Sequence, residues 1–182
     1  MAPAVSRSGL VPAGADPDAY DRLRRRVLWS LPTGLYLLGT AAGARRNLMT
    51  CNWATQLATS PKLVGVSVEN GVHTYELLRE GRCFTLCLLR REDRAIVRKF
   101  VKPASDDREA RTLSGVPYRD APVSGAPIVA SALAVLDCTL VHEVPLGSHT
   151  LFVGEVVDVM APDGDGELAV LRMEDTRMSY GG

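Results

Sequence analysis

Residues 47–89, NLMTCNWATQLATSPKLVGVSVENGVHTYELLREGRCFTLCLL, carry the clearest strand and helix patterns of the chain. Within KLVGVSVE, Val64, Val66 and Val68 alternate with small or polar residues, which predicts a strand with one buried face. HTYELLREG predicts a short helix that ends at Gly81, and CFTLCLL predicts a return to strand. Strands are therefore expected over 47–58, 62–69 and 83–89, with a helix over 73–81.

Outside this stretch, the same periodicities predict more strands and few helices. Asp16 followed by Pro17 is typical of a helix start, and Pro32 ends that helix. Ile96, Val97 and Phe100 lie on one stripe of a further helix. Further strands are expected over 34–41, 132–144, 148–160 and 167–173, a helix over 93–101, and an irregular excursion over 102–127. Because no regular helices separate the strands, an antiparallel barrel or sandwich is favoured over a doubly wound sheet.

Composition bounds the class of protein. The 182 residues carry 21 basic and 21 acidic side chains, and this balance argues against a general nucleic-acid binder. No apolar run approaches the ~20 residues of a membrane span, and the N-terminal segment lacks the apolar core of a signal peptide. We expect a cytoplasmic protein with no membrane partner, a mobile arm over 1–15 and a single domain over 16–182.

Motifs for several common chemistries are absent from the sequence. There is no GxGxxG, GxxxxGK[ST] or GxSxG, and no histidines or cysteines stand at metal-ligand spacing. No metal site is therefore predicted. Cys51, Cys83, Cys87 and Cys138 are interpreted as buried free thiols. His142 alternates with Leu140 and Val144, so it is expected to pack in the core.

Three segments carry candidate chemistry. His73 and Thr74 follow a strand and open a helix, with Thr74 as the expected N-cap, and a helix start binds phosphate through its free N–H groups. Ordinary capping beside a surface histidine is the alternative, and the residues leave both open. The segment 47–61 combines Thr, Asn and Gln with Trp53, which suits a flat polar heterocycle, although a polar edge strand is the alternative. His149 follows Gly147-Ser148 at a strand start, where it can hold a substrate group.

Together these pieces resemble the flavin reductase family, whose fold is the FMN-binding split barrel. The resemblance runs from about residue 31 to residue 171 through an ordered series of segments. These are LPTGLYLLGT, NLMTCNWATQLATSPKLVGVSV, HTYELLREGRCFTLCLL, the Lys99-Phe100 pair, GAPIV and GSHTLFVGEV. It implies a mainly β, antiparallel Greek-key split barrel with a few short flanking helices.

The resemblance also implies a site. It places four segments around the flavin. These are the strand and its continuation at 46–53, the neighbouring strand at 67–69, the helix start at 73–74 beside the phosphate, and the later helix at 99–100. The implied cofactor-binding residues are Arg46, Asn47, Leu48, Met49, Thr50, Cys51, Asn52, Trp53, Ser67, Val68, Glu69, His73, Thr74, Lys99 and Phe100. His149 is the implied catalytic residue beside the nicotinamide, and Asn52 and Trp53 lie where the dinucleotide would stack. The family's Gly-Asp-His element is Gly147-Ser148-His149 here, so the usual acidic neighbour is replaced.

The function that the resemblance implies is NAD(P)H-dependent reduction of a flavin. NADH or NADPH would pass a hydride to FMN, with FAD as the alternative flavin, and the reduced flavin would serve a partner monooxygenase. A homodimer is also implied. The alternative function is an FMN-binding, flavoredoxin-like electron carrier without NAD(P)H oxidase activity. A third reading is a barrel that has lost its flavin and serves as an interaction domain.

Overall fold

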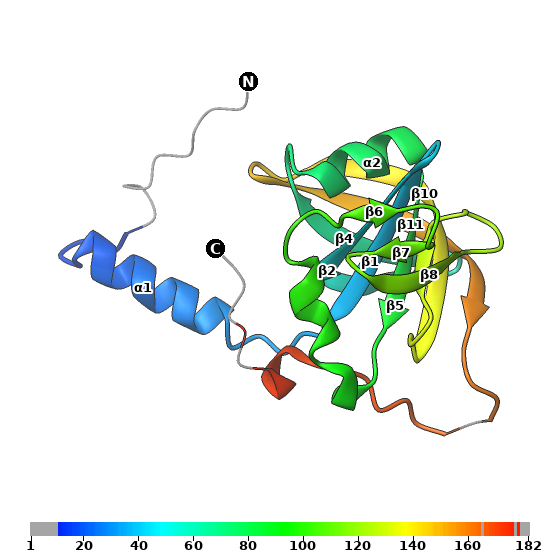
Figure 1. Ribbon diagram of the computed structural model, residues 1–182. Coiled ribbons are helices and arrows are strands. Elements are labelled where there is room, and N and C mark those ends of the chain that lie inside the picture. Colours follow the sequence, from blue (N-terminus) through cyan, green and yellow to red (C-terminus); the bar gives the residue numbers. More distant parts are fainter. Residues whose placement is uncertain (1–10, 165, 177, 179–182) are drawn as a thin grey trace.

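The computed structural model describes residues 11–164, 166–176 and 178. The first ten residues of the expected arm therefore lie outside the described residues, and the arm stays a prediction. Figure 1 shows a barrel of strands with α2 across one end and α1 standing off to one side. The helices are α1 (Pro17–Leu28) and α2 (His73–Gly81), with short 3-10 turns η2 (Arg91–Asp93), η3 (Ile96–Phe100) and η4 (Met173–Asp175).

The strands form two sheets. The main sheet contains β1 (Tyr36–Ala42), β2 (Arg45–Cys51), β3 (Ala54–Thr59), β4 (Lys62–Glu69), β5 (Cys83–Leu88), β10 (Ala134–Pro145) and β11 (His149–Met160). The small sheet contains β6 (Asp106–Asp107), β7 (Thr112–Leu113), β8 (Val116–Asp120) and β9 (Pro127–Val129). All pairings are antiparallel, so the expected mainly β, antiparallel architecture is confirmed.

The strand order explains why the barrel is split. The main sheet runs β2-β1-β5-β10-β11-β4-β3, so β2 and β3 are its two edges. In the chain these edges are joined by only Asn52 and Trp53, which forces the sheet to curl until its edges meet there. The Ser67 N–H donates to the Trp53 carbonyl at 2.9 Å and fixes this junction. In the described sheet β2 and β3 are not hydrogen-bonded neighbours, so the barrel is not closed by a ladder between them.

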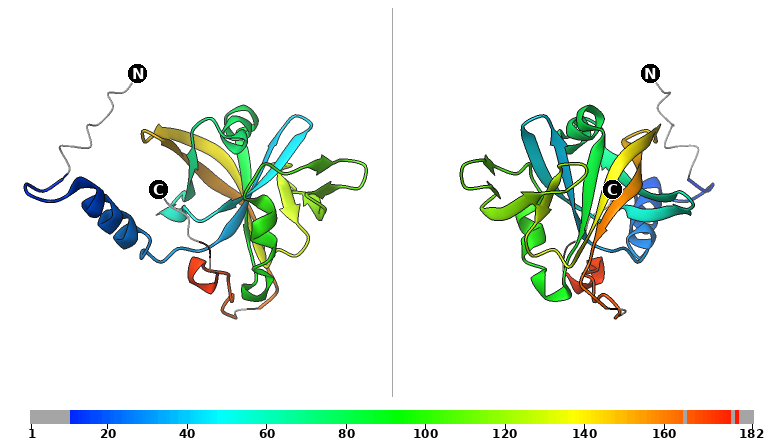
Figure 2. Two further views of the ribbon diagram at one scale, coloured as in Figure 1. Left: turned by 60° about the vertical axis from the view of Figure 1, so that its left-hand side comes forward. Right: turned by 90° about the vertical axis from the view of Figure 1, so that its right-hand side faces the viewer.

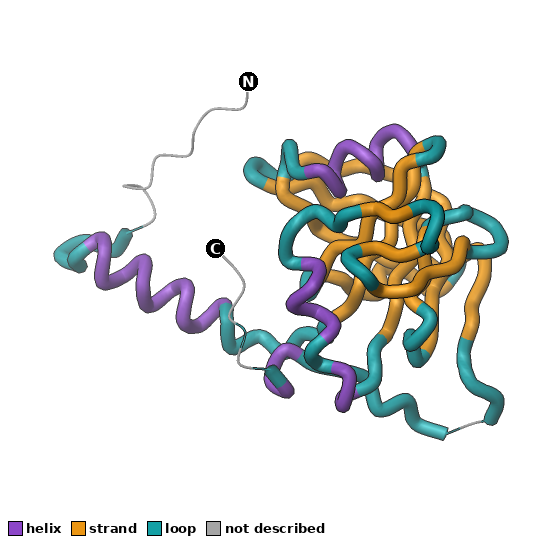
Figure 3. The backbone as a smooth tube through the Cα atoms, viewed as in Figure 1, coloured by secondary structure: helices purple, strands orange, loops and turns teal. Residues whose placement is uncertain are grey.

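Two apolar cores hold this arrangement. One fills the barrel and contains Phe84 and Phe152, both fully buried. The other lies outside the barrel wall, between β1, β2, β5 and the small sheet, around Phe100 and Leu113. Figure 3 shows the excursion that carries the small sheet folded against the barrel. The excursion expected to be irregular is thus partly ordered, because it covers an apolar outer face of the barrel.

Close approach explains the glycine at the end of α2. A Cβ atom on Gly81 would lie 1.6 Å from the Ala41 carbonyl oxygen. The following residue, Arg82, takes the left-handed conformation that ends the helix, and its N–H donates to the Leu78 carbonyl. Glycine therefore lets α2 lie directly against β1.

Several expected elements differ from the structure. The strand expected over 47–58 is broken at Asn52 and Trp53 into β2 and β3. The helix expected over 93–101 is two 3-10 turns, with the Val97 carbonyl bonded to the Thr50 hydroxyl at 2.5 Å. The strand expected over 167–173 makes only isolated bridges, at Val170 and Arg172.

His142 is exposed, so the expectation of a core histidine is wrong. The pairing of β10 with β11 shifts register between Leu140 and His142, and this bulge reverses the alternation of buried and exposed positions. The four cysteines are free and buried, as expected.

Candidate functional site

A cavity of about 200 Å³ lies along β2 and the junction that joins β2 to β3. Its walls come from β2, the junction between β2 and β3, the end of β4, the start of α2, and the residues after η3. It brings together most of the residues implied by the resemblance, from segments far apart in the sequence. These are Asn47, Met49, Thr50, Cys51, Asn52, Trp53, Ser67, Val68, Glu69, His73, Thr74, Phe100 and His149.

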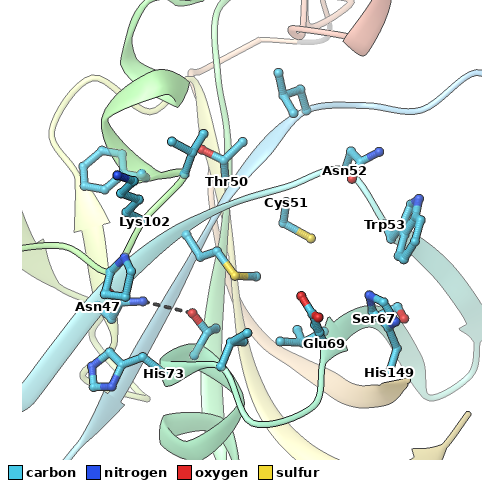
Figure 4. A pocket seen from close by; sticks show the side chains of 18 of the residues that line it. Asn47, Thr50, Cys51, Asn52, Trp53, Ser67, Glu69, His73, Lys102 and His149 are labelled. Carbon is cyan, nitrogen blue, oxygen red and sulfur yellow. Dashed lines mark hydrogen bonds between the residues drawn. The ribbon is translucent and has the colours of Figure 1, made fainter. Parts of the chain in front are cut away.

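The cavity has two chemically different ends. Figure 4 shows Asn47, His73 and Lys102 at one end and Trp53, Ser67 and His149 at the other. The first end is polar and carries a cation, whereas the second is aromatic. This polarity suits an elongated ligand with an anionic end and a flat end.

The polar end is built around the start of α2. The helix N-cap is Val72, which supplies no side-chain cap, so Thr74 is not the N-cap that the sequence suggested. Instead, the Thr74 hydroxyl accepts a hydrogen bond from the Asn47 amide at 3.0 Å. The first N–H groups of α2 therefore lack a capping side chain, beside His73 and Lys102. This end can bind an anion such as a phosphate.

Asn47 is the link between this helix start and the rest of the cavity wall. Its side chain is only 1% exposed, and its carbonyl oxygen accepts from the Ala104 N–H at 2.9 Å. With its bond to Thr74, it joins β2, α2 and the segment after η3. The Asn47 amide therefore positions these three segments, and its contact with a cofactor stays a prediction.

The aromatic end pairs a histidine with an indole. The rings of Trp53 and His149 lie 4.9 Å apart at an interplanar angle of 58°. The Ser148 hydroxyl lies 2.9 Å from the His149 Nδ1 atom, within hydrogen-bonding distance. Glu69 stands opposite His149 in the β4–β11 pairing. These contacts join an indole and an imidazole, tilted against each other, in the lining of this end of the cavity.

The wall between the two ends is largely apolar. Met49, Cys51 and Val68 line it, and burial raises the pKa of the Cys51 thiol to about 12. Cys51 is therefore a neutral thiol that packs rather than reacts. The Thr50 hydroxyl is engaged with the Val97 carbonyl, so main-chain groups are what this strand offers to a ligand.

Three residues implied by the resemblance do not line the cavity. The Arg46 guanidinium bonds to Asp120 at 3.1 Å, Leu48 is fully buried in the outer core, and Lys99 is exposed. Seven lining residues were not singled out from the sequence. These are Leu35, Val72, Val101, Lys102, Pro103, Met173 and Met178. Lys102 follows Lys99 by three residues, just after the end of η3, and it lines the cavity whereas Lys99 does not.

A second cavity, of about 850 Å³, adjoins the aromatic end. It lies between the end of α1 and the C-terminal segment, and both cavities share Asn52, Trp53, Met173 and Met178. Arg25 and Arg172 are among its lining residues, and their guanidinium groups are ion-paired with Asp21 and Glu174. A ligand longer than the first cavity can therefore continue into the second.

Other classes of site find no support in the described part of the chain. Among those residues, no group of three His, Cys, Asp or Glu side chains gathers at metal-binding distance. The described helices include none long and apolar enough to span a membrane.

The donor set of the first cavity fits a neutral heterocycle that carries a phosphate. Uncapped N–H groups, His73 and Lys102 suit the phosphate, and main-chain groups of β2 and its junction suit the polar edge of a ring. The apolar wall and the Trp53 and His149 rings suit its flat faces.

Comparisons with known proteins agree with this geometry. Residues 28–179 match the family described as "Flavin reductase like domain". An NADPH-flavin oxidoreductase of Streptomyces viridifaciens is 31% identical over 157 residues, covering 84% of this chain and 80% of that protein. The reductase component of a 4-nitrophenol monooxygenase of Rhodococcus opacus is 26% identical, covering 78% and 72%.

A solved structure is also similar to this chain. The NADH:FAD oxidoreductase of Streptomyces globisporus, in complex with NAD and FAD fragments, is 28% identical with a TM-score of 0.69. The alignment covers 81% of this chain and 85% of that one. With a family match over most of its length, this chain belongs to the flavin reductase-like domain family.

Proposed function

We propose that this protein is an NAD(P)H-dependent flavin reductase, which transfers a hydride from a nicotinamide to FMN or FAD. The observation that carries the proposal is the cavity with an anion-binding end and an aromatic end, at the split of the barrel. Relatives that are NAD(P)H-flavin oxidoreductases support the same reading.

The polar end would hold the flavin phosphate. His73, Lys102 and the first N–H groups of α2 supply donors and positive charge there, and Asn47 keeps the helix start in place. The strand β2 would present main-chain groups to the ring edge, with Met49 and Val68 against its face. These residues bind and orient the cofactor and exclude water from it.

The aromatic end would receive the nicotinamide. Trp53 and His149 provide a rigid surface for its ring, and the Ser148 hydroxyl fixes the imidazole. The flavin, when bound, supplies the hydride acceptor. The protein's own contribution is to bring the two rings together, and this task needs neither a metal nor an acid–base pair.

The second cavity would take the remainder of the dinucleotide. Its Arg25 and Arg172 side chains suit phosphate groups, and it opens directly beside Trp53. We also propose that reduced flavin leaves for a partner monooxygenase, as the relative from Rhodococcus opacus is a monooxygenase reductase component.

The test of the flavin site compares two lysines. Lys102→Ala should raise the Kd for FMN about tenfold, since one charge-assisted phosphate contact contributes on the order of 1.4 kcal/mol, and should leave riboflavin binding unchanged. Lys99→Ala is the matched control, because Lys99 is exposed and does not line the cavity. Flavin fluorescence titrations measure both. Equal losses for FMN and riboflavin, or a loss only in Lys99→Ala, would contradict the assignment.

A tightly held flavin without NAD(P)H oxidation would favour the electron-carrier alternative over the reductase. Failure to bind any flavin would remove the proposal altogether.

A further inference from the structure

The histidine of the aromatic end lies at the tip of a hairpin whose residues are exposed. His149 is the first residue of β11, and residues 144–148, which lead into it from β10, are all exposed. The Leu146 N–H donates to the His149 carbonyl at 2.8 Å and closes the turn. Gly147 takes a φ of +82°, as the first position of so tight a hairpin turn requires. Hydrogen bonds rather than apolar packing therefore hold this tip in place.

Asn70 supplies three of these hydrogen bonds from a different segment. Its Nδ2 atom donates to the Gly147 carbonyl at 2.7 Å, and its Oδ1 atom accepts from the Thr150 hydroxyl at 2.8 Å. Its main-chain N–H donates to the Ser148 carbonyl at 3.0 Å. We call these three bonds the Asn70 clamp. The clamp holds the chain on both sides of His149.

One end of the clamp is shielded from water. Asn70 itself is exposed, but Thr150 is only 4% exposed. Leaving a buried hydroxyl without its partner destabilises a protein more than losing an exposed hydrogen bond. The bond between Thr150 and Asn70 therefore anchors the clamp to the barrel.

The clamp continues where the strand pairing stops. The ladder between β4 and β11 ends with Glu69 opposite His149, and Asn70 is the next residue after β4. Two residues later, Val72 is the N-cap of α2, at the polar end of the cavity. Figure 1 and the left view of Figure 2 show the hairpin tip beside this turn from β4 into α2. Asn70 does not itself line the cavity, so it acts on a ligand there through His149.

The other contacts of His149 restrain the ring but not the turn that carries it. The Ser148 hydroxyl, 2.9 Å from Nδ1, belongs to the same turn and moves with it. The Trp53 indole, 4.9 Å away between ring centroids, packs against the imidazole and not against the turn. The Asn70 side chain is the group that joins the turn to the neighbouring segment on either side of His149.

We propose that Asn70 is a positioning residue for the nicotinamide end, because its side chain holds the hairpin tip so that the His149 imidazole stays against Trp53. The kinetic consequence rests on the proposed function, whereas the position of the imidazole does not. A group that orients a reacting ring must be held closely, since a small displacement lowers the rate of the reaction.

The direct test is the proton NMR spectrum of the imidazoles, recorded at one fixed pH on the full chain before flavin is added. The chain has three histidines, and the His149 signals are identified by their loss in His149→Ala. The indole of Trp53 shifts these signals through its ring current. In Asn70→Ala they should move towards those of the exposed His142, and the other imidazole signals should stay in place.

The matched control is Gln56→Ala, which removes an exposed amide on β3 that lines neither cavity. It should leave all the imidazole signals where they are in the wild type. His149 signals that do not move in Asn70→Ala would overturn the proposal. This readout needs no turnover, so it decides the position of the imidazole even if the protein oxidises no nucleotide.

Kinetics then separate positioning from general damage to the fold. Asn70→Ala should lower kcat/KM for NADH or NADPH about fivefold, the factor expected when one net hydrogen bond no longer restrains a group. The Kd for FMN should change less than about twofold, since the polar end does not depend on the clamp. Thr150→Val removes the hydroxyl and should show part of the same loss, whereas Thr150→Ser keeps the hydroxyl and should restore the rate.

A double variant tests whether Asn70 acts through His149. Adding Asn70→Ala to His149→Ala should cause no further loss of kcat/KM, because the group that Asn70 positions is already absent. A further loss of about fivefold, or an equal loss of FMN affinity, would show that Asn70 supports the fold in general and would overturn the proposal. If the wild type oxidised no nucleotide while the His149 signals moved, the proposed function would fail and the positioning by Asn70 would stand.

Discussion

Replacing Asn47 by alanine should damage both the stability of the barrel and the proposed flavin site. The side chain is 1% exposed and makes two hydrogen bonds, to the Thr74 hydroxyl at 3.0 Å and from the Ala104 N–H at 2.9 Å. Each bond contributes roughly 1 kcal/mol net, and the partners left behind add the cost of unsatisfied polar groups, about 1–3 kcal/mol. The expected loss in the free energy of unfolding is therefore about 2–4 kcal/mol, or roughly 5–15 °C in Tm for a chain of this size.

The same change should weaken flavin binding, because Asn47 ties the start of α2 and the segment beside Lys102 to β2. We expect the Kd for FMN to rise about tenfold, equivalent to about 1.4 kcal/mol of lost positioning. Urea unfolding and flavin fluorescence titration measure the two effects. Gln56→Ala is the control, since this amide is exposed on the neighbouring strand β3 and bonds only to the Ala58 carbonyl at 3.3 Å. If Asn47→Ala lost under 0.5 kcal/mol and bound FMN normally, the positioning role would be refuted.

Three further predictions concern other parts of the chain. Gly81→Ala should lower the Tm by more than about 3 °C, because the new Cβ would lie 1.6 Å from the Ala41 carbonyl oxygen. A Tm within about 3 °C of the wild type would contradict this. In the native protein Cys51 should resist a thiol reagent at mildly alkaline pH, because burial raises the pKa of its thiol to about 12, and it should react once the protein is unfolded. Rapid labelling of the native protein would show that β2 opens. Hydrogen bonds from Arg46 and Arg111 outweigh partial burial and lower the pKa of Asp120, so the stability that it contributes is present above its unfolded pKa and lost as the pH falls through the lower folded value. Asp120→Asn should therefore flatten the acid limb of a Tm-against-pH curve, and an unchanged limb would show that the pairing contributes nothing.

Regular local patterns allowed accurate prediction of several elements. The alternating valines of β4 and the apolar spacing of α2 gave both elements their observed bounds, and Asp16 caps α1 through the Ala19 N–H at 2.7 Å. These elements are determined by nearby residues, so a sequence pattern is enough.

Elements that depend on distant contacts were harder to predict. The apolar stripe of Ile96, Val97 and Phe100 predicts an α-helix. In the structure the Thr50 hydroxyl donates a hydrogen bond to the Val97 carbonyl, and the segment forms a 3-10 turn. The pattern of the C-terminal segment predicts a strand. In the structure, main-chain hydrogen bonds join Leu171 to Leu35 on one side and to Leu89 on the other, and the segment forms only isolated bridges. In both cases the deciding partner lies far away in the sequence.

The candidate site also combines residues that the sequence predicts with residues that only distant contacts bring together. Thirteen of the residues implied by the resemblance line the cavity. The resemblance implies Lys99, whereas the lysine that lines the cavity is Lys102. It also assigned Arg46 to the cofactor, although the guanidinium is held by Asp120. Contributions from the C-terminal segment, such as Met173, carry no local signal, because they arise only when that segment folds back beside Trp53.

The most direct test of the central claim is oxidation of NADH and NADPH by the purified protein, with and without added FMN or FAD. We predict oxidation that depends on the flavin, and a lower rate in His149→Ala because His149 and Trp53 form the proposed surface for the nicotinamide. A protein that binds flavin but oxidises neither nucleotide would contradict the reductase assignment and favour the electron carrier.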